Sequence, residues 1–230
     1  IWEKRDHFDY EIDGLIFTPM TFGVGADKMN EANEINGKKF TWKHSFKWKP
    51  PKYNTIDFLV TTVKDKDGKD LVKHVVHENG NMMNEAIEYK TLMLMCGFDK
   101  KRDGFMNPFD DVLFDNIPKD NYGKHDESKY EAVPFVPTTP YHPESYLCHM
   151  PLTPAGFQTL RMKTLEGDYF EDDTIVEFQY SKDDDTKQGP WKWIPLRVRF
   201  DKTQQLREGK KSMNNYATAN DNWKSIHYPV

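Results

Sequence analysis

Compact and alternating runs of hydrophobic residues along the chain predict β-strands more often than helices. Such runs occupy residues 12–17, 39–49, 56–63, 71–76 and 89–96, and turn-forming residues bound several of them. A short apolar or alternating run that ends at Gly, Pro, Asn or Asp is typical of a strand. Further short strands are predicted at residues 146–150, 157–162, 175–180 and 191–200.

The end of the chain shows a different pattern. Apolar residues between positions 203 and 226 are spaced among polar ones, which predicts one or two helices. Residues 99–145 are rich in Asp, Lys, Asn, Gly and Pro, and the prolines near the end of this stretch favour an extended, irregular segment. These patterns together predict a fold between α/β and mainly β.

Composition limits the classes of function that the chain can serve. Its 230 residues are 37% hydrophobic and 14% aromatic, which is enough for one large or two small domains with a sizeable core. The formal net charge of −5 means that binding of phosphate or RNA must come from local basic clusters. Two cysteines, Cys96 and Cys148, make no disulfide framework and fit a reducing compartment. No apolar run approaches the ~20 residues of a membrane span, so we expect no membrane partner.

A short basic sequence, Lys47-Trp48-Lys49-Pro50, is the first candidate for chemistry. Side chains alternate between the faces of a strand, so Lys47 and Lys49 are expected on one face with Trp48 on the other. Two ammonium groups on one face form a local clamp for phosphate oxygens. The alternative is an amphipathic edge strand with solvated lysines.

An acidic residue beside a glycine, Asp13-Gly14, lies within the predicted apolar strand at residues 12–17. A carboxylate there could reach a metal ion or a ribose hydroxyl while the glycine lets the backbone approach a ligand. Taken alone, the pair is more simply an ordinary Asp-Gly turn.

A third candidate lies near the end of the chain, where Arg197 and Arg199 alternate with apolar residues and so share one strand face. Asp201 would share that face if the strand continued, with Lys202 opposite or in a turn. Such a set can bind the β- and γ-phosphates of a nucleotide, with the acid orienting its own arginine. The alternative is a ladder of cross-strand ion pairs on a solvated sheet.

In combination, residues 10–18, 47–58 and 193–203 resemble, in order, motifs IV, V and VI of the nucleotidyltransferases that include DNA ligases and mRNA-capping guanylyltransferases. The details are closer to the capping enzymes of large cytoplasmic DNA viruses. The Trp-Lys-Pro ending of the basic sequence and the Arg199-Phe200-Asp201-Lys202 sequence follow the capping pattern, and the tail at 219–227 also resembles that viral branch.

The resemblance implies a two-step reaction, in which a lysine takes GMP from GTP and passes it to the diphosphate end of RNA. By matching position, Lys47 and Lys49 would bind the nucleotide phosphates, and Asp13 would hold Mg²⁺ or Mn²⁺ near the reacting phosphate. A set of four residues would orient the β- and γ-phosphates: Arg197, Arg199, Asp201 and Lys202. The implied partners are GTP, the 5′ end of RNA, and triphosphatase and N7-methyltransferase domains of the same polypeptide. The implied location is a viral factory in the host cytoplasm, or the virion.

The resemblance also implies a domain plan. Residues 1–70 would end a nucleotidyltransferase domain, residues 71–203 would form an OB-fold barrel with a long irregular insertion, and residues 204–230 would lead toward a methyltransferase domain. Two phosphate clamps on separate domains would imply closure over GTP and opening for RNA. The chain begins with Ile1-Trp2 inside an ordered-looking pattern, so we expect it to be a piece of a longer polypeptide that includes an upstream half of the nucleotidyltransferase.

The nucleophilic lysine of the family is missing from its expected place. It lies in a Lys-x-Asp-Gly sequence upstream of the acidic motif, but Lys4 is the only lysine before Asp13, and Arg5 and Asp6 follow it. A Lys-x-Asp-Gly sequence at residues 101–104 comes after the basic sequence instead, in a polar setting typical of a surface loop. We therefore expect the nucleophile outside this chain, which alone should form no lysine-GMP.

Two other functions remain open from the sequence. An ATP-dependent polynucleotide ligase would use ATP in place of GTP. A non-catalytic RNA-binding module built on the OB-fold would bind RNA without Lys47 and Lys49 and would bind no nucleotide. The pairs His74/His77 and Cys148/His149 match no zinc-binding spacing well, so a structural role is expected for them.

Overall fold

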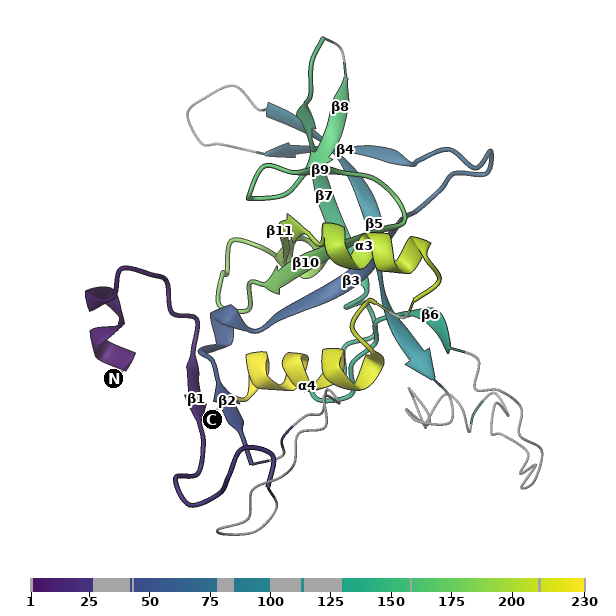
Figure 1. Cartoon of the computed structure of the whole chain (residues 1–230). Coiled ribbons are helices and arrows are strands. Elements are labelled where there is room, and N and C mark those ends of the chain that lie inside the picture. Colours follow the sequence, from purple (N-terminus) through teal and green to yellow (C-terminus); the bar gives the residue numbers. More distant parts are fainter. Residues whose placement is uncertain are drawn as a thin grey trace, which may run out of the picture. The chain divides into compact units, whose positions relative to one another are not determined.

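The structure is a computed structural model, and it describes residues 2–26, 42, 44–77, 85–99, 113, 130–157, 159–210 and 212–229. The chain divides into two compact units, residues 1–53 and residues 54–230 (Figure 1). The predicted boundary between residues 70 and 71 falls inside the larger unit, in the connection between two strands. The assignment of these regions to domain families stays a prediction.

The smaller unit is built on a two-stranded antiparallel sheet. Its elements are the 3₁₀ helix η1 (Trp2–His7), strands β1 (Leu15–Phe17) and β2 (Phe46–Trp48), and the 3₁₀ turn η2 (Pro51–Tyr53). The Trp2 ring lies 5.3 Å from that of Trp48 and 6.3 Å from that of Tyr53, measured between centroids. Gly25 and Ala26 are the buried residues in the described part of this unit, so it has little core of its own.

The larger unit holds a strongly bent antiparallel sheet that is nearly closed into a barrel (Figure 1). Among the described residues, nine strands form it, in the order β11-β10-β3-β5-β7-β8-β9, with β4 and β6 also paired to β5. The strands are β3 (Thr55–Thr62), β4 (Val72–His77), β5 (Glu85–Asp99), β6 (Tyr130–Pro134), β7 (Leu147–Pro154), β8 (Leu160–Lys163), β9 (Tyr169–Phe170), β10 (Thr174–Tyr180) and β11 (Trp193–Val198).

Strand β5 organises this sheet, because its 15 residues reach four partners. Its first half pairs with β4 and β7, and its second half pairs with β3 and β6. The strands predicted at 89–96 and 175–180 fall within β5 and β10, and those predicted at 56–63 and 71–76 each extend one residue beyond β3 and β4. The prediction of a mainly β fold is confirmed.

The core of the larger unit is aromatic. Phe58 and Phe178 are fully buried on neighbouring strands, and the Phe58 ring lies 5.3 Å from that of Trp193. Trp223 of helix α4 closes the cluster, with its ring 5.9 Å from that of Trp193. Large rings supply much apolar area from few residues, which suits a barrel of short strands.

Two helices follow the last strand, as the sequence predicts. Helix α3 (Phe200–Arg207) begins one residue after β11 ends, and helix α4 (Tyr216–His227) is capped by Asn215, whose side chain accepts a hydrogen bond of 2.9 Å from the backbone N–H of Thr218. Ala219, Trp223 and Ile226 recur at helical spacing and bury one face of α4. In the part of the chain that the structure describes, no helix is long and apolar enough to cross a membrane.

Candidate nucleotide-binding residues

The pairing of β1 with β2 brings the acidic and basic sequences of the smaller unit together. Leu15 lies opposite Trp48, so Asp13 and Gly14 continue alongside Lys49. A Cβ atom at Gly14 would lie 2.2 Å from the carbonyl oxygen of Trp48, so only glycine allows this close approach of the two backbones. The Lys49 ammonium group pairs with Asp13 Oδ2.

The Asp13–Lys49 pair is open to solvent. The side chain of Lys49 is 37% exposed and that of Asp13 is 64% exposed. Lys47 lies on β2 opposite Ile16 and is also exposed. A carboxylate and two ammonium groups are thus accessible on one two-stranded sheet, where an anionic ligand can reach them.

A second cluster, in the larger unit, surrounds Asp57 on β3. This carboxylate is only 8% exposed and accepts a hydrogen bond of 2.8 Å from the Arg199 guanidinium. The Lys202 ammonium group donates to the same oxygen, Asp57 Oδ2. A buried carboxylate needs such partners, since an unpaired charge in a low-dielectric site is costly.

Glu177 extends this cluster to the next strands. It lies directly opposite Asp57 on β3 and opposite Arg197 on β11. Arg197 Nε donates to Glu177 Oε2 at 2.7 Å, and Thr55 Oγ1 donates to Oε1 at 2.6 Å. Burial alone would raise the pKa of Glu177, but the hydrogen bond from Thr55 and the nearby guanidinium groups together hold that pKa below its usual value.

The end of β11 decides how the last motif is arranged. The strand stops at Val198, and the backbone N–H of Arg199 donates to the carbonyl oxygen of Ile175 at 2.8 Å. The chain then turns into α3, whose first turn carries Asp201 and Lys202. Lys202 therefore faces Asp57, whereas Asp201 is 63% exposed, 3.5 Å from Arg199 Nε. Asp201 does not continue the strand face of Arg197 and Arg199.

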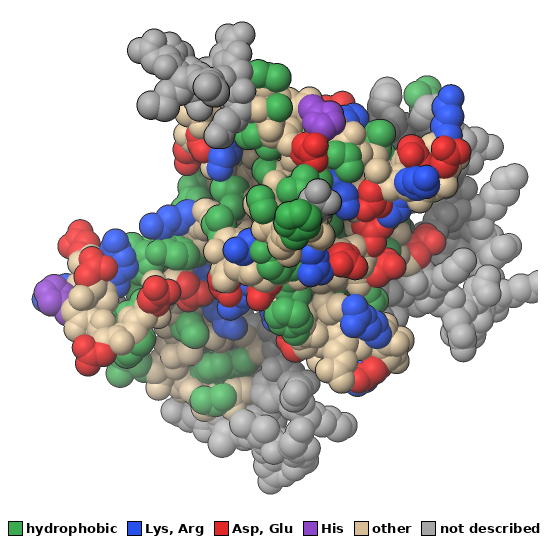
Figure 2. Space-filling view, turned by 90° about the horizontal axis from the view of Figure 1, so that it is seen from above, with side chains coloured by type: hydrophobic (Ala, Val, Ile, Leu, Met, Phe, Trp, Pro, Cys, Tyr) green, Lys and Arg blue, Asp and Glu red, His purple; other side chains and the backbone are tan. Residues whose placement is uncertain are grey.

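Charges in this second cluster are balanced. Three cations, Arg197, Arg199 and Lys202, meet three carboxylates, Asp57, Glu177 and Asp201. An incoming phosphate would have to compete with Asp57 for Arg199 and Lys202. Figure 2 shows a similar mixture on the face it presents, where basic and acidic side chains are interspersed.

Asp57 and Glu177 are the functional-site residues that sequence reasoning missed. Each interrupts an apolar run, at Ile56-Asp57-Phe58 and at Val176-Glu177-Phe178. A charge inside a strand that is buried on both faces needs an opposite charge, and two arginines on one strand need counter-ions. That pattern was a usable signal for pairing the strands through these side chains.

Among the described residues, no group of three His, Cys, Asp or Glu side chains is placed so that it could hold a metal ion. Asp13 offers a single carboxylate. Burial raises the pKa of the Cys148 thiol well above its usual value, so this sulfur is a poor ligand. His74 lies on β4 with Nδ1 3.6 Å from Glu88. The Lys-x-Asp-Gly sequence at 101–104 lies outside the described residues.

Comparison with known proteins finds a distant relative. The chain is 28% identical over 222 residues to the "Probable mRNA-capping enzyme" of Acanthamoeba polyphaga mimivirus. The match covers 96% of this chain and 15% of the mimivirus protein. No family model and no solved structure matches. The chain is therefore related to an mRNA-capping enzyme, at the level of one segment of a much longer protein.

Proposed function

We propose that this chain is part of an mRNA guanylyltransferase, which transfers GMP from GTP to the 5′ diphosphate end of RNA through a lysine-GMP intermediate. The observation that carries the proposal is the pairing of β1 with β2, which sets Asp13 beside Lys49 and leaves Lys47 exposed on the same two-stranded sheet. The relationship to a capping enzyme supports the choice among nucleotidyltransferases.

In this proposal the nucleophilic lysine belongs to the upstream half of the nucleotidyltransferase, outside these 230 residues. Its Nζ attacks the α-phosphorus of GTP, a P–N bond forms and pyrophosphate leaves. An oxygen of the RNA diphosphate then attacks the same phosphorus, and the lysine is released. Negative charge grows on the phosphoryl oxygens, so fixed cations such as Lys47 and Lys49 accelerate the step.

The second cluster would act on the leaving group. Arg197, Arg199 and Lys202 would orient the β- and γ-phosphates, with Asp201 beside Arg199. Asp57 would hold Arg199 and Lys202 in the right place until phosphates bind. The bent sheet of the larger unit would be the OB-fold domain of the family, a partly open barrel that often binds oligonucleotides.

A divalent cation, Mg²⁺ or Mn²⁺, fits the exposed carboxylate of Asp13. Mg²⁺ is usually held by one or two carboxylates together with substrate phosphates, so one acid on the hairpin is enough when GTP is present. The ion would neutralise phosphate charge near the reacting phosphorus. Asp13 would then exchange Lys49 for the cation, and Lys49 would turn to phosphate.

The test is a covalent labelling assay. We would incubate the chain and the upstream half with α-labelled GTP and Mg²⁺ and look for a protein-GMP band after denaturing electrophoresis. We expect a band that Lys49→Ala abolishes, because one phosphate-binding cation is lost. Lys52→Ala is the matched control: Lys52 is a nearby exposed lysine whose ammonium group lies over the Tyr53 ring, and the band should persist. Lys101→Ala should also leave the band intact.

Other outcomes point elsewhere. A band with ATP but none with GTP would favour a polynucleotide ligase. Loss of the band in Lys101→Ala would make residues 101–104 the source of the nucleophile. With no band for either nucleotide, a non-catalytic RNA-binding module would explain the chain better.

A further inference from the structure

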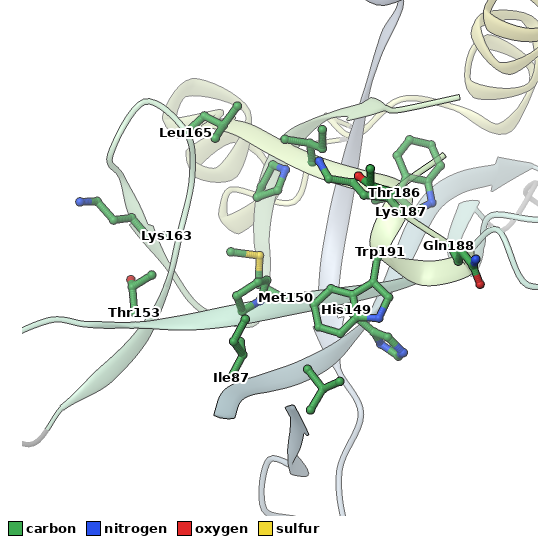
Figure 3. Close-up of a pocket in the computed structure, with 15 residues that line it drawn as sticks. Ile87, His149, Met150, Thr153, Lys163, Leu165, Thr186, Lys187, Gln188 and Trp191 are labelled. Atoms are coloured by element: carbon green, nitrogen blue, oxygen red, sulfur yellow. The ribbon is translucent and has the colours of Figure 1, made fainter. Parts of the chain in front are cut away.

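A pocket of about 710 Å³ opens on the larger unit and is lined by none of the residues assigned above to GTP. Ile87 of β5 and Met150 of β7 form its floor. Its walls come from the end of β8 with the turn that follows it, and from the 3₁₀ helix η3 (Gly189–Lys192). In Figure 3, Thr153 and Lys163 lie at one end, Trp191 and Gln188 lie at the other, and Met150 and Ile87 lie between them. Pockets of this volume hold ligands of drug or nucleotide size.

Three aromatic rings form one wall of this pocket and its support. The Trp191 ring lies 5.1 Å from that of His149 and 5.0 Å from that of Tyr89, and the His149 and Tyr89 rings are 4.7 Å apart. Trp191 and His149 line the pocket itself. The contacts fix the indole of Trp191 from behind, so its free surface is held ready for a flat ligand.

The surroundings of His149 disfavour its charged form. Its Nδ1 lies 3.2 Å from the hydroxyl of Thr91. Burial, and the positive charge of Lys73, lower the pKa of His149 below its usual value. The imidazole ring is inclined by 74° to the indole of Trp191, so His149 borders a flat ligand that stacks on Trp191.

Two lysine side chains lie at the rim of this otherwise apolar pocket. Lys163 lines it and points its ammonium group outward (Figure 3). Lys187 also lines it, and its Nζ lies 3.6 Å from Asp184, which offsets part of its charge. The Lys163 ammonium group lies 5.4 Å from the centroid of the Tyr169 ring, a contact that does not neutralise its charge, so Lys163 is the stronger of the two as a partner for an anion. A flat apolar wall with a basic rim is complementary to a nucleotide, in which a base is joined to a phosphate.

We propose that this pocket is a subsite for single-stranded RNA, in which a base stacks on Trp191 beside His149 and the neighbouring phosphate contacts Lys163. The choice of RNA as occupant rests on the proposed function and on the charge of the rim. An apolar protein segment would use the floor but would gain nothing from Lys163 and Lys187. Single strands present unstacked bases, whereas a duplex does not.

The experiment measures the affinity of the full 230-residue chain for a fluorescein-labelled single-stranded RNA, without GTP and without the upstream half. Trp191→Ala should weaken binding about tenfold, in line with the loss of one stacked base. Trp191→Phe keeps an aromatic ring and should restore most of the affinity. Lys163→Ala should weaken binding about threefold and reduce the salt dependence by about one phosphate contact.

Two matched controls lie outside the pocket, the exposed Lys66 and the exposed Tyr141. Alanine at either position should leave the affinity for RNA unchanged. Crosslinking with RNA that carries 4-thiouridine should label Trp191, His149 or residues beside them. The crosslink also tests the subsite in the wild-type chain, where no variant can misfold.

An affinity that Trp191→Ala leaves unchanged, with crosslinks elsewhere, would overturn the proposal, and an apolar protein segment would become the better occupant. This result is separable from a failure of the proposed function. If lysine-GMP forms but RNA does not bind at Trp191, only the subsite is wrong. If RNA binds at Trp191 but no lysine-GMP forms, the subsite stands and the guanylyltransferase assignment fails.

Discussion

Both charged clusters pair carboxylates with cations, but the two clusters differ in burial. Asp13 and Lys49 are exposed, and a solvent-exposed ion pair contributes about 0–1 kcal/mol to stability. Asp57 is 8% exposed and holds two cations. Removing one partner of a buried pair leaves a charge without compensation, which costs about 3–5 kcal/mol. The exposed pair is thus suited to exchange partners with a ligand, and the buried cluster is suited to fix side chains in place.

A double-mutant cycle on Asp57 and Lys202 tests this difference. We expect Asp57→Ala to lower the free energy of unfolding by about 3 kcal/mol, because Arg199 and Lys202 both lose their buried partner. Lys202→Met should cost less, since Arg199 still pairs with Asp57. The coupling between the two substitutions should be about 1–2 kcal/mol. Urea denaturation followed by tryptophan fluorescence measures all three values.

Lys49→Met is the matched control for that cycle, because it breaks an exposed pair of the same chemistry. It should cost less than about 1 kcal/mol. An Asp57→Ala variant as stable as Lys49→Met would mean that Asp57 contributes nothing to the fold, and its role in holding Arg199 and Lys202 would have to be abandoned.

At the scale of elements, hydrophobic patterning located most strands but not all of their ends. The strand predicted at 191–200 ends at Val198, because helix α3 begins at Phe200. The strand predicted at 157–162 starts only at Leu160, after a turn in which Gly156 has a φ of 129°. Such ends depend on hydrogen bonds and turns that periodicity does not encode.

The hydrophobic pattern of the sequence also did not predict the full length of β5. Residues 89–96 read as a strand of ordinary length, but β5 runs over Glu85–Asp99 because β4 and β6 each extend one of its ends. Partners for Asp57 were similarly hidden, since Arg199 lies 142 positions away along the chain. By contrast, the order of the motifs along the chain was enough to predict Asp13 and Lys49 as nucleotide-binding residues.

Helix α4 is the element whose contribution to the core is most concentrated in one residue. Trp223 is fully buried, and its ring lies 4.7 Å from that of Tyr180 and 4.1 Å from that of His227. Its indole N–H donates to the carbonyl oxygen of Pro140 at 3.0 Å. The residue thus joins the end of the chain to the barrel through both apolar and polar contacts.

We predict that Trp223→Ala lowers the free energy of unfolding by about 4 kcal/mol, through the cavity and the unpaired carbonyl group that it leaves. Lys224→Ala, at the exposed neighbouring position, should change stability by less than about 0.5 kcal/mol. Thermal or urea unfolding of both variants measures the difference. If the two variants were equally stable, α4 would not be part of the cooperative core.

At the scale of the whole molecule, several side chains have lowered pKa values, and each of them makes the fold less stable as the pH falls. Burial lowers the pKa of His149 and of His227 below the usual 6.5. Hydrogen bonds from Lys64 and Lys90 hold the pKa of Asp70 below its usual 3.8. For Asp172, burial raises the pKa, but hydrogen bonds from Lys64 and Thr62 outweigh it and the net pKa is lowered.

Each of these groups has a folded pKa below its unfolded pKa, so the unfolded chain binds protons first as the solution is acidified. The stability that they contribute is full above the unfolded pKa and is lost as pH falls through the folded pKa. The contribution of the histidines to stability is therefore lost below about pH 6.5, and that of the carboxylates is lost below about pH 4.

We predict a decline in the free energy of unfolding in two steps between about pH 8 and pH 3, measured by urea denaturation at each pH. Each proton taken up on unfolding gives a slope of up to about 1.4 kcal/mol per pH unit. His227→Gln should make the first step smaller, since His149 still contributes to it, and should leave the second step unchanged. Lys64→Met should do the reverse, because Asp70 and Asp172 lose their shared ammonium group.

Each variant controls for the other, since a general loss of stability would lower the whole curve without changing either slope. A single acid step that neither variant alters would show that these groups titrate alike in the folded and unfolded chain, and the ion-pair network around Lys64 would then contribute nothing to acid resistance.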